Sequence, residues 1–203
     1  MNPEDAGKKT DRANHEANPA GHSTRSSLIL VTGAARSGKS EWAEALAAQS
    51  SRFVTYVATA QLDPDDLEWQ ARIRQHQQRR PADWKTLHVP LDLAATLRQA
   101  EASECLLVDS LGTWLANWLE QDESTWEQTA QELLDSLAQT VAQVIFVAEE
   151  TGWGVVPAYP IGRTFRDRLG KLTRQIGALA NPVYLVAGGH VLNLSQLGTP
   201  LPH

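Results

Sequence analysis

Short apolar runs alternate with amphipathic stretches along most of this chain. The runs of strand length lie at residues 28–32, 53–58, 105–109, 144–148 and 183–187. They are continuous rather than alternating, which is typical of parallel strands buried on both faces. Between them, apolar residues recur at helical spacing at 40–49, 64–78, 91–99, 111–119, 124–141 and 161–180.

Strands that alternate with helices predict an α/β fold, with a mainly parallel sheet and helices on both of its faces. After Gly188-Gly189, residues 190–194 are expected to return as an antiparallel strand at the C-terminal edge. The pattern leaves the order of the strands open.

The first residues differ in character from the rest of the chain. Residues 1–27 are polar and balanced in charge, so we expect a disordered tail followed by one catalytic domain at 28–203. The tail lacks the hydrophobic stretch of a signal peptide, and no apolar run reaches the roughly 18–20 residues of a membrane span. We therefore expect a cytoplasmic protein without a membrane span.

Composition narrows the classes of partner. Lys and Arg number 18 against 24 Asp and Glu, and the formal net charge of −6 disfavours binding to a nucleic-acid backbone. Cys105 is the only cysteine, which excludes an internal disulfide and a cysteine-rich zinc site. A small anionic ligand fits this chain better than a nucleic acid.

The strongest motif directly follows the first expected strand. The run Gly33-Ala34-Ala35-Arg36-Ser37-Gly38-Lys39-Ser40 matches the phosphate-binding pattern G-x-x-x-x-G-K-[ST] and stands between a strand and a helix. The glycines allow backbone N–H groups to surround phosphate oxygens. Lys39 would reach the β- and γ-phosphates, and the Ser40 hydroxyl would bind Mg²⁺. The motif predicts a P-loop NTPase fold, of the RecA-like type.

An acidic residue, Asp109, ends the expected strand at 105–109. A carboxylate at the carboxyl end of an apolar strand in a P-loop fold commonly holds Mg²⁺ or one of its waters. The alternative is a surface aspartate that caps the helix beginning at Leu111.

Residues 72–84 concentrate positive charge in an otherwise acidic chain. Four arginines surround His76, which suggests a site for a polyphosphate or another anion. The alternative is a solvated helix face with an incidental histidine.

The helix expected at 161–180 also carries basic residues. A solvated face and a contact to phosphate or a neighbouring subunit both fit them: Arg163, Arg166, Arg168, Lys171 and Arg174.

Several motifs together resemble one enzyme family. They are the P-loop, Tyr56-Val-Ala-Thr-Ala-Gln61, Arg72-Ile-x-x-His76 with Arg80-Pro81-x-x-Trp84, Leu106-Leu-Val-Asp109, and Glu150-Thr-Gly-Trp-Gly-Val-Val-Pro157 with Phe165-Arg-Asp167. Their order and spacing between about Leu28 and Leu194 resemble the bifunctional adenosylcobinamide kinase / adenosylcobinamide-phosphate guanylyltransferase family. The P-loop alone is generic, whereas the histidine segment and the Gly-Trp-Gly-Val-Val-Pro segment make the match specific.

The resemblance implies an enzyme of cobalamin biosynthesis that uses ATP and GTP as substrates, Mg²⁺ as cofactor and adenosylcobinamide as acceptor, and that assembles as a homotrimer. It makes His76 the nucleophile that takes up GMP, with Lys39 as a second catalytic residue. The triphosphate would lie on the P-loop, and Mg²⁺ on Ser40 and Asp109. Further nucleotide contacts would come from Thr59, Ala60, Gln61, Gln77, Gln78, Arg79, Arg80 and His88.

The chain departs from the family pattern at three single positions and in one segment, Ala158-Tyr-Pro-Ile-Gly162, which stands where the family is usually more polar. His88 stands where family members usually carry an acidic residue, Glu149 where they usually carry asparagine, and Thr151 where they usually carry valine.

Two other functions also fit the motifs: a small-molecule P-loop kinase without guanylyl transfer, and a nucleotide-gated binding module with little turnover.

Overall fold

The computed structural model describes residues 27–61 and 80–201. This part of the chain contains a seven-stranded sheet with the strand order β3-β2-β4-β5-β1-β6-β7. Neighbouring strands are parallel except β6 and β7, which form the antiparallel edge pair expected after Gly188-Gly189. The strands are β1 (Leu28–Gly33), β2 (Phe53–Ala58), β3 (Lys85–His88), β4 (Glu104–Asp109), β5 (Gln143–Glu149), β6 (Val183–Ala187) and β7 (His190–Asn193).

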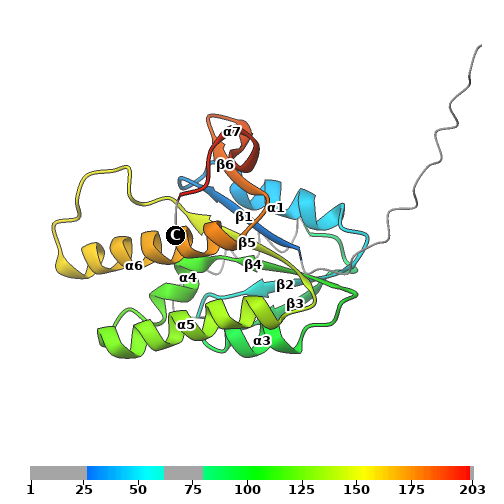
Figure 1. Cartoon of the computed structure of the whole chain (residues 1–203), viewed down its shortest axis with the longest axis horizontal. Helices are drawn as coiled ribbons and strands as arrows, with labels where there is room; N and C mark the ends of the chain where they lie inside the picture. Colours follow the sequence, from blue (N-terminus) through cyan, green and yellow to red (C-terminus); the bar gives the residue numbers. More distant parts are fainter. Residues whose placement is uncertain (1–26, 62–79, 202–203) are drawn as a thin grey trace, which may run out of the picture.

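Helices cover both faces of the sheet, as predicted. Figure 1 shows α1 on one side and α3, α5 and α6 on the other. Alternate residues of each strand supply the two hydrophobic clusters, so that Val31 packs with α1 and Leu30 packs with the opposite helices. The helices are α1 (Lys39–Ala48), α3 (Leu93–Gln99), α4 (Leu111–Ala116), α5 (Glu123–Gln139), α6 (Pro160–Leu179) and the single turn α7 (Leu194–Leu197).

Polar residues begin the helices that follow β4. The Ser110 hydroxyl accepts a hydrogen bond from the Thr113 backbone N–H, and the Thr113 side chain bonds back to the Ser110 backbone, which forms a capping box at α4. Asp122 caps α5 through the Thr125 N–H. Trp114 of α4 and Trp126 of α5 are both buried, with ring centroids 5.8 Å apart, so these two tryptophans serve the core.

Several boundaries differ from the sequence prediction. The edge strand β3 was not expected, because Lys85–His88 is mostly exposed and lacks an apolar run. The helix expected at 111–119 ends at Ala116, since residues 117–120 form turns. The helix expected at 64–78 and residues 1–26 of the tail expected at 1–27 lie outside the described residues. Within residues 27–61 and 80–201, no helix is long and apolar enough to cross a membrane.

Candidate active site

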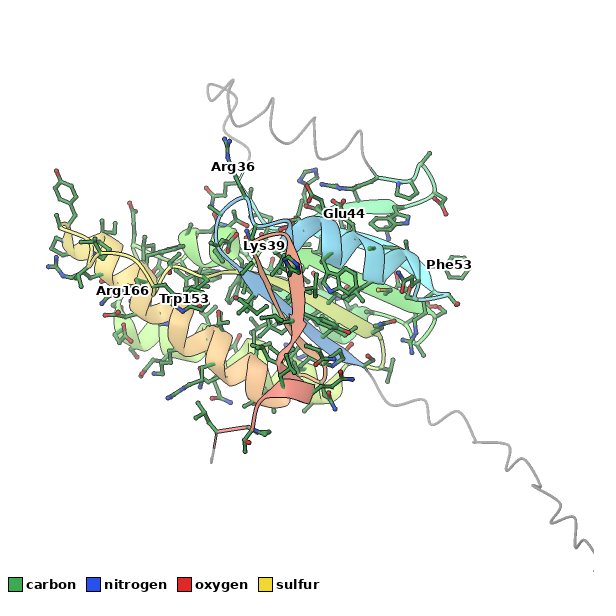
Figure 2. All side chains as sticks on the ribbon, turned by 90° about the horizontal axis from the view of Figure 1, so that it is seen from above. Arg36, Lys39, Glu44, Phe53, Trp153 and Arg166 are labelled. Atoms are coloured by element: carbon green, nitrogen blue, oxygen red, sulfur yellow. The ribbon has the colours of Figure 1, made fainter. Side chains whose placement is uncertain are left out.

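The P-loop connects β1 to α1 at the carboxyl edge of the sheet. Gly38 adopts φ 94°, a left-handed conformation that glycine tolerates best, and α1 begins at the next residue. The Lys39 side chain folds back toward the loop, with Nζ 3.5 Å from the Ala34 carbonyl oxygen. Figure 2 shows Lys39 within the body of the fold, whereas Arg36 points out from the loop into solvent. The structure therefore places a turn between β1 and α1 as the motif predicts, with the Lys39 side chain folded over it.

One hydroxyl of this loop packs against its first glycine. The buried Ser37 Oγ has no hydrogen-bond partner among the described residues, and a Cβ atom on Gly33 would lie 2.6 Å from it. A side chain at position 33 would collide with it, so the loop needs glycine there. Ser40, at the start of α1, is half-buried.

The carboxylate of Asp109 lies at the same edge of the sheet as the P-loop. Strand β5 separates β4 from β1; Asp109 is in register with Val147, and Gly33 is in register with Glu149. Parallel strands place their carboxyl ends together, which explains why residues more than 70 positions apart in the sequence meet here. Asp109 does not cap α4, because Ser110 takes that position, so its carboxylate is left at the edge of the sheet where the P-loop also lies.

Tyr56 of β2 holds Asp109 from the neighbouring strand. Its hydroxyl donates a hydrogen bond to Asp109 Oδ2 at 2.9 Å. Burial of the phenol, reinforced by the adjacent Asp109 charge, raises the pKa of Tyr56 well above its usual range, so the hydroxyl remains a neutral donor. This bond was not expected from the sequence, where Tyr56 belongs to an apolar strand.

Glu149, at the end of β5, binds the segment that follows Asp109. It accepts a hydrogen bond from the Ser110 hydroxyl at 2.5 Å and one from the Gly112 N–H at 3.0 Å. A Cβ atom on Gly112 would overlap the Glu149 carboxylate. Glycine at position 112 and glutamate at position 149 are therefore sterically matched.

Thr59 is fully buried and takes part in a network of hydrogen bonds near the same edge of the sheet. Its hydroxyl donates to the Ser110 carbonyl at 2.8 Å and accepts from the Ser110 N–H at 3.0 Å. Asn117 then donates to the Thr59 carbonyl at 2.8 Å. The structure turns the Thr59 side chain into the protein, whereas Ala60 is half-buried and Gln61 is exposed.

The cationic segment is described only from Arg80 onward; His76, Gln77, Gln78 and Arg79 lie outside the described residues. The Arg80 guanidinium carbon lies 3.1 Å from the centroid of the Tyr56 ring, a cation–π contact. His88 is exposed at the end of the edge strand β3, in register with Ala58. The structure thus brings Arg80 next to the Asp109 partner and leaves His88 at the periphery.

The late family-like segment is exposed. Trp153 is 72% exposed and Val155 is 95% exposed, and Figure 2 shows Trp153 beside α6. In α6, Arg163 donates to the Pro157 and Ala158 carbonyl groups at 3.0 and 2.8 Å. Arg168 is buried and binds the Trp118 and Gln121 carbonyl groups and the Glu123 carboxylate, so it belongs neither to a solvated face nor to a phosphate site.

Oxygen ligands of the Mg²⁺ type are available at this edge. In the described part of the chain, no group of three or more His, Cys, Asp or Glu side chains could hold a metal. A P-loop site needs fewer protein ligands, because Mg²⁺ is usually held by one or two side chains together with phosphates and waters. The Ser40 hydroxyl and the Asp109 carboxylate are of the right chemistry for that arrangement.

A family model described as cobinamide kinase / cobinamide phosphate guanyltransferase (CobU) matches residues 29–194, which include every site residue named above. The chain belongs to this family. The bifunctional adenosylcobalamin biosynthesis protein CobP of Pseudomonas aeruginosa is 44% identical over 174 residues, which cover 85% of this chain and 98% of the relative. The bifunctional adenosylcobalamin biosynthesis protein CobU of Escherichia coli is 36% identical, covering 80% of this chain and 96% of the relative.

The CobU protein of Salmonella typhimurium is 35% identical over 180 residues, covering 80% of this chain and 96% of the relative. A solved structure from Pyrococcus horikoshii OT3 is similar in fold alone, with a TM-score of 0.50 and 6% identity over 88% of this chain and 94% of that one. The family relationship confirms the resemblance that the motifs indicated and the P-loop NTPase fold that goes with it.

Proposed function

We propose that this protein phosphorylates adenosylcobinamide with ATP or GTP, and then transfers GMP from GTP to the phosphorylated product through His76. The observation that carries the proposal is a P-loop, with Lys39 inside it and Asp109 at the same edge, in a chain that the bifunctional family model covers from residue 29 to 194. Cobalamin biosynthesis is the process named for the relatives.

In the kinase reaction, the γ-phosphoryl group passes from the nucleotide to a hydroxyl group of adenosylcobinamide. The phosphorus–oxygen bond to the β-phosphate breaks, a new one forms to the acceptor, and the hydroxyl proton leaves. The P-loop N–H groups, the amino end of α1 and Lys39 stabilise the negative charge on the phosphates. Ser40 and Asp109 would hold Mg²⁺, which when bound neutralises phosphate charge.

In the guanylyl transfer, a neutral imidazole nitrogen of His76 attacks the α-phosphorus of GTP, and pyrophosphate leaves. The phosphate of adenosylcobinamide phosphate then attacks the same phosphorus, which breaks the phosphorus–nitrogen bond and gives adenosylcobinamide-GDP. Arg80 places positive charge close to the segment that carries His76. The contacts of the other nucleotide-binding candidates, Gln61, Gln77, Gln78, Arg79 and His88 among them, remain predictions.

The proposal includes a cytoplasmic location, where both nucleotides are available, and a homo-oligomeric assembly, a trimer by resemblance. Size-exclusion chromatography with light scattering tests the assembly. The polar tail at 1–27 takes no part in the proposed chemistry, and the net charge of −6 supports small-molecule substrates over nucleic acid.

Labelled GTP tests the function directly. We expect the wild-type protein to take up label from α-³²P-GTP as an acid-labile, alkali-stable adduct, and His76→Ala to take up none. His22→Ala, which changes a histidine of the tail outside the proposed site, is the matched control and should retain the label. With γ-labelled nucleotide, both variants should still phosphorylate cobinamide.

Three results would contradict the proposal in different ways. A wild-type protein that phosphorylates cobinamide but takes up no α-label is a simple kinase. If the label persists in His76→Ala and disappears in His88→Ala, the nucleophile is His88 of the edge strand β3. Nucleotide binding without any product from cobinamide would indicate the binding module.

A further inference from the structure

Tyr56 brings a phenol hydroxyl into the buried part of an apolar cluster under α1. It is 4% exposed, and the buried members of the cluster around it include Val54, Cys105, Leu107 and Ile145. A phenol hydroxyl in such surroundings needs a partner, because an unpaired buried hydroxyl lowers stability. Its partner here is the Asp109 carboxylate, at 2.9 Å.

The sheet register explains how the two side chains meet. Tyr56 is in register with Leu107, and Ala58 is in register with Asp109 on the adjacent strand. Tyr56 and Asp109 are therefore diagonal neighbours on one face of the sheet, close enough for a long side chain to bridge. Because both strands are buried in the sheet, the bond restrains the orientation of the carboxylate.

Arg80 holds the tyrosine from its other side. Its guanidinium lies over the Tyr56 ring at 3.1 Å from the centroid, and the buried Arg80 Nε has no hydrogen-bond partner among the described residues. The contact with the ring therefore helps to hold this side chain against β2. Arg80, Tyr56 and Asp109 form a continuous row from the cationic segment to the acidic end of β4.

We infer that Tyr56 is a positioning residue for Mg²⁺-dependent nucleotide binding, acting by holding Asp109 Oδ2 so that the carboxylate faces the metal in one orientation. This inference rests on the proposed function, because that function assigns Asp109 to Mg²⁺. Tyr56 itself touches neither nucleotide nor metal in this arrangement. Removal of its hydroxyl should therefore weaken the contribution of Mg²⁺ and leave metal-free binding unchanged.

The test compares the affinity for GTP in Mg²⁺ with the affinity in EDTA, by isothermal titration calorimetry on the full chain carrying His76→Ala, so that guanylyl transfer to the protein does not consume the GTP. Tyr56→Phe keeps the ring and its contact with Arg80 and removes only the hydroxyl. We expect the Mg²⁺-dependent gain in GTP affinity to fall by about three- to tenfold, the size of one ordinary hydrogen bond. The affinity in EDTA should stay at the wild-type value.

Tyr184→Phe is the matched control. Tyr184 packs against the same cluster and lies edge-on to Trp42 at 5.6 Å, away from the Asp109 bond. It should leave both affinities unchanged. In an Asp109→Asn background, Tyr56→Phe should have little further effect, because the two residues act through one bond.

Each result decides the inference. It is wrong if Tyr56→Phe keeps the full Mg²⁺-dependent gain, if the loss is equally large in EDTA, or if the effects of Tyr56→Phe and Asp109→Asn simply add. A wild-type protein whose GTP affinity ignores Mg²⁺ would overturn it together with the metal assignment. A protein that gains affinity from Mg²⁺ but makes no cobinamide product would refute the proposed function alone.

Discussion

The close contact between Gly112 and Glu149 predicts that Gly112→Ala lowers the stability of the wild-type protein but not of a variant that lacks the Glu149 carboxylate. On Gly112→Ala, the new methyl group would occupy the position of the Glu149 carboxylate, and the three heavy atoms nearest to it all belong to Glu149. The carboxylate would have to move away from the Gly112 N–H and the Ser110 hydroxyl. In an otherwise open helix, the same change would be favourable by up to about 1 kcal/mol.

The magnitude follows from the two hydrogen bonds. A bond to a charged group contributes about 1.5–3 kcal/mol when buried, and Glu149 is only half-buried, so we take about 2–3 kcal/mol for the two bonds together. After the helical gain is subtracted, Gly112→Ala should lower the free energy of unfolding by about 1–2 kcal/mol. That corresponds to a fall of about 2–8 °C in Tm for a chain of this size.

The decisive measurement is a double-mutant cycle with Glu149→Ala. Chemical unfolding is followed by tryptophan fluorescence, since the buried Trp114 lies in the helix that begins beside the altered site. In the Glu149→Ala background, Gly112→Ala should be neutral or stabilising, giving a coupling energy of about 1–3 kcal/mol. Glu150→Ala, which removes a charge from the next residue, is the control and should leave the cost of Gly112→Ala unchanged.

Two results would refute the steric argument. One is a Gly112→Ala variant as stable as the wild type. The other is a cost that is the same with and without Glu149, which would mean that the methyl group meets something else.

Three further predictions concern the rest of the fold. Burial raises the pKa of the Cys105 thiol to about 11. In the unfolded chain the thiol ionises at a pKa of about 8.5, so the neutral buried thiol contributes fully to folding stability below that pH, and this contribution is lost as the pH rises toward 11. Between pH 7.5 and 10 the wild type should therefore lose about 2 kcal/mol more than Cys105→Ala, and equal losses in urea titrations would contradict this. Arg168→Met leaves the carbonyl groups and the Glu123 carboxylate that the guanidinium binds without their partner. It should lower the free energy of unfolding by about 2–4 kcal/mol in thermal unfolding. Lys171→Met, at an exposed ion pair, should lower it by less than about 1 kcal/mol. Asn117→Ala removes an amide that donates to two backbone carbonyl groups at 2.8 Å and should cost about 1–3 kcal/mol; a variant of unchanged Tm would show that water replaces these bonds.

The sequence by itself determined the architecture and predicted the nucleotide site. Continuous apolar runs that alternate with helical periods allow little besides a covered parallel sheet, and the P-loop is a contiguous motif whose function depends on its own backbone. The family motifs are also local, which is why the family was evident before the structure. The edge strand β3 was missed because exposed residues such as Lys85 carry no periodic signal, and their pairing depends on the neighbouring strand.

Only the tertiary structure decided which side chains from different strands meet. The Tyr56–Asp109 bond depends on the register between β2 and β4, and the Glu149–Gly112 contact depends on the insertion of β5 between β4 and β1. Neither the register nor the strand order can be read from local periodicity, because both are set by long-range pairing of strands. Arg168 makes the same point: its place on a basic helix suggested solvent or phosphate, and packing of α6 against the end of α4 buried it instead.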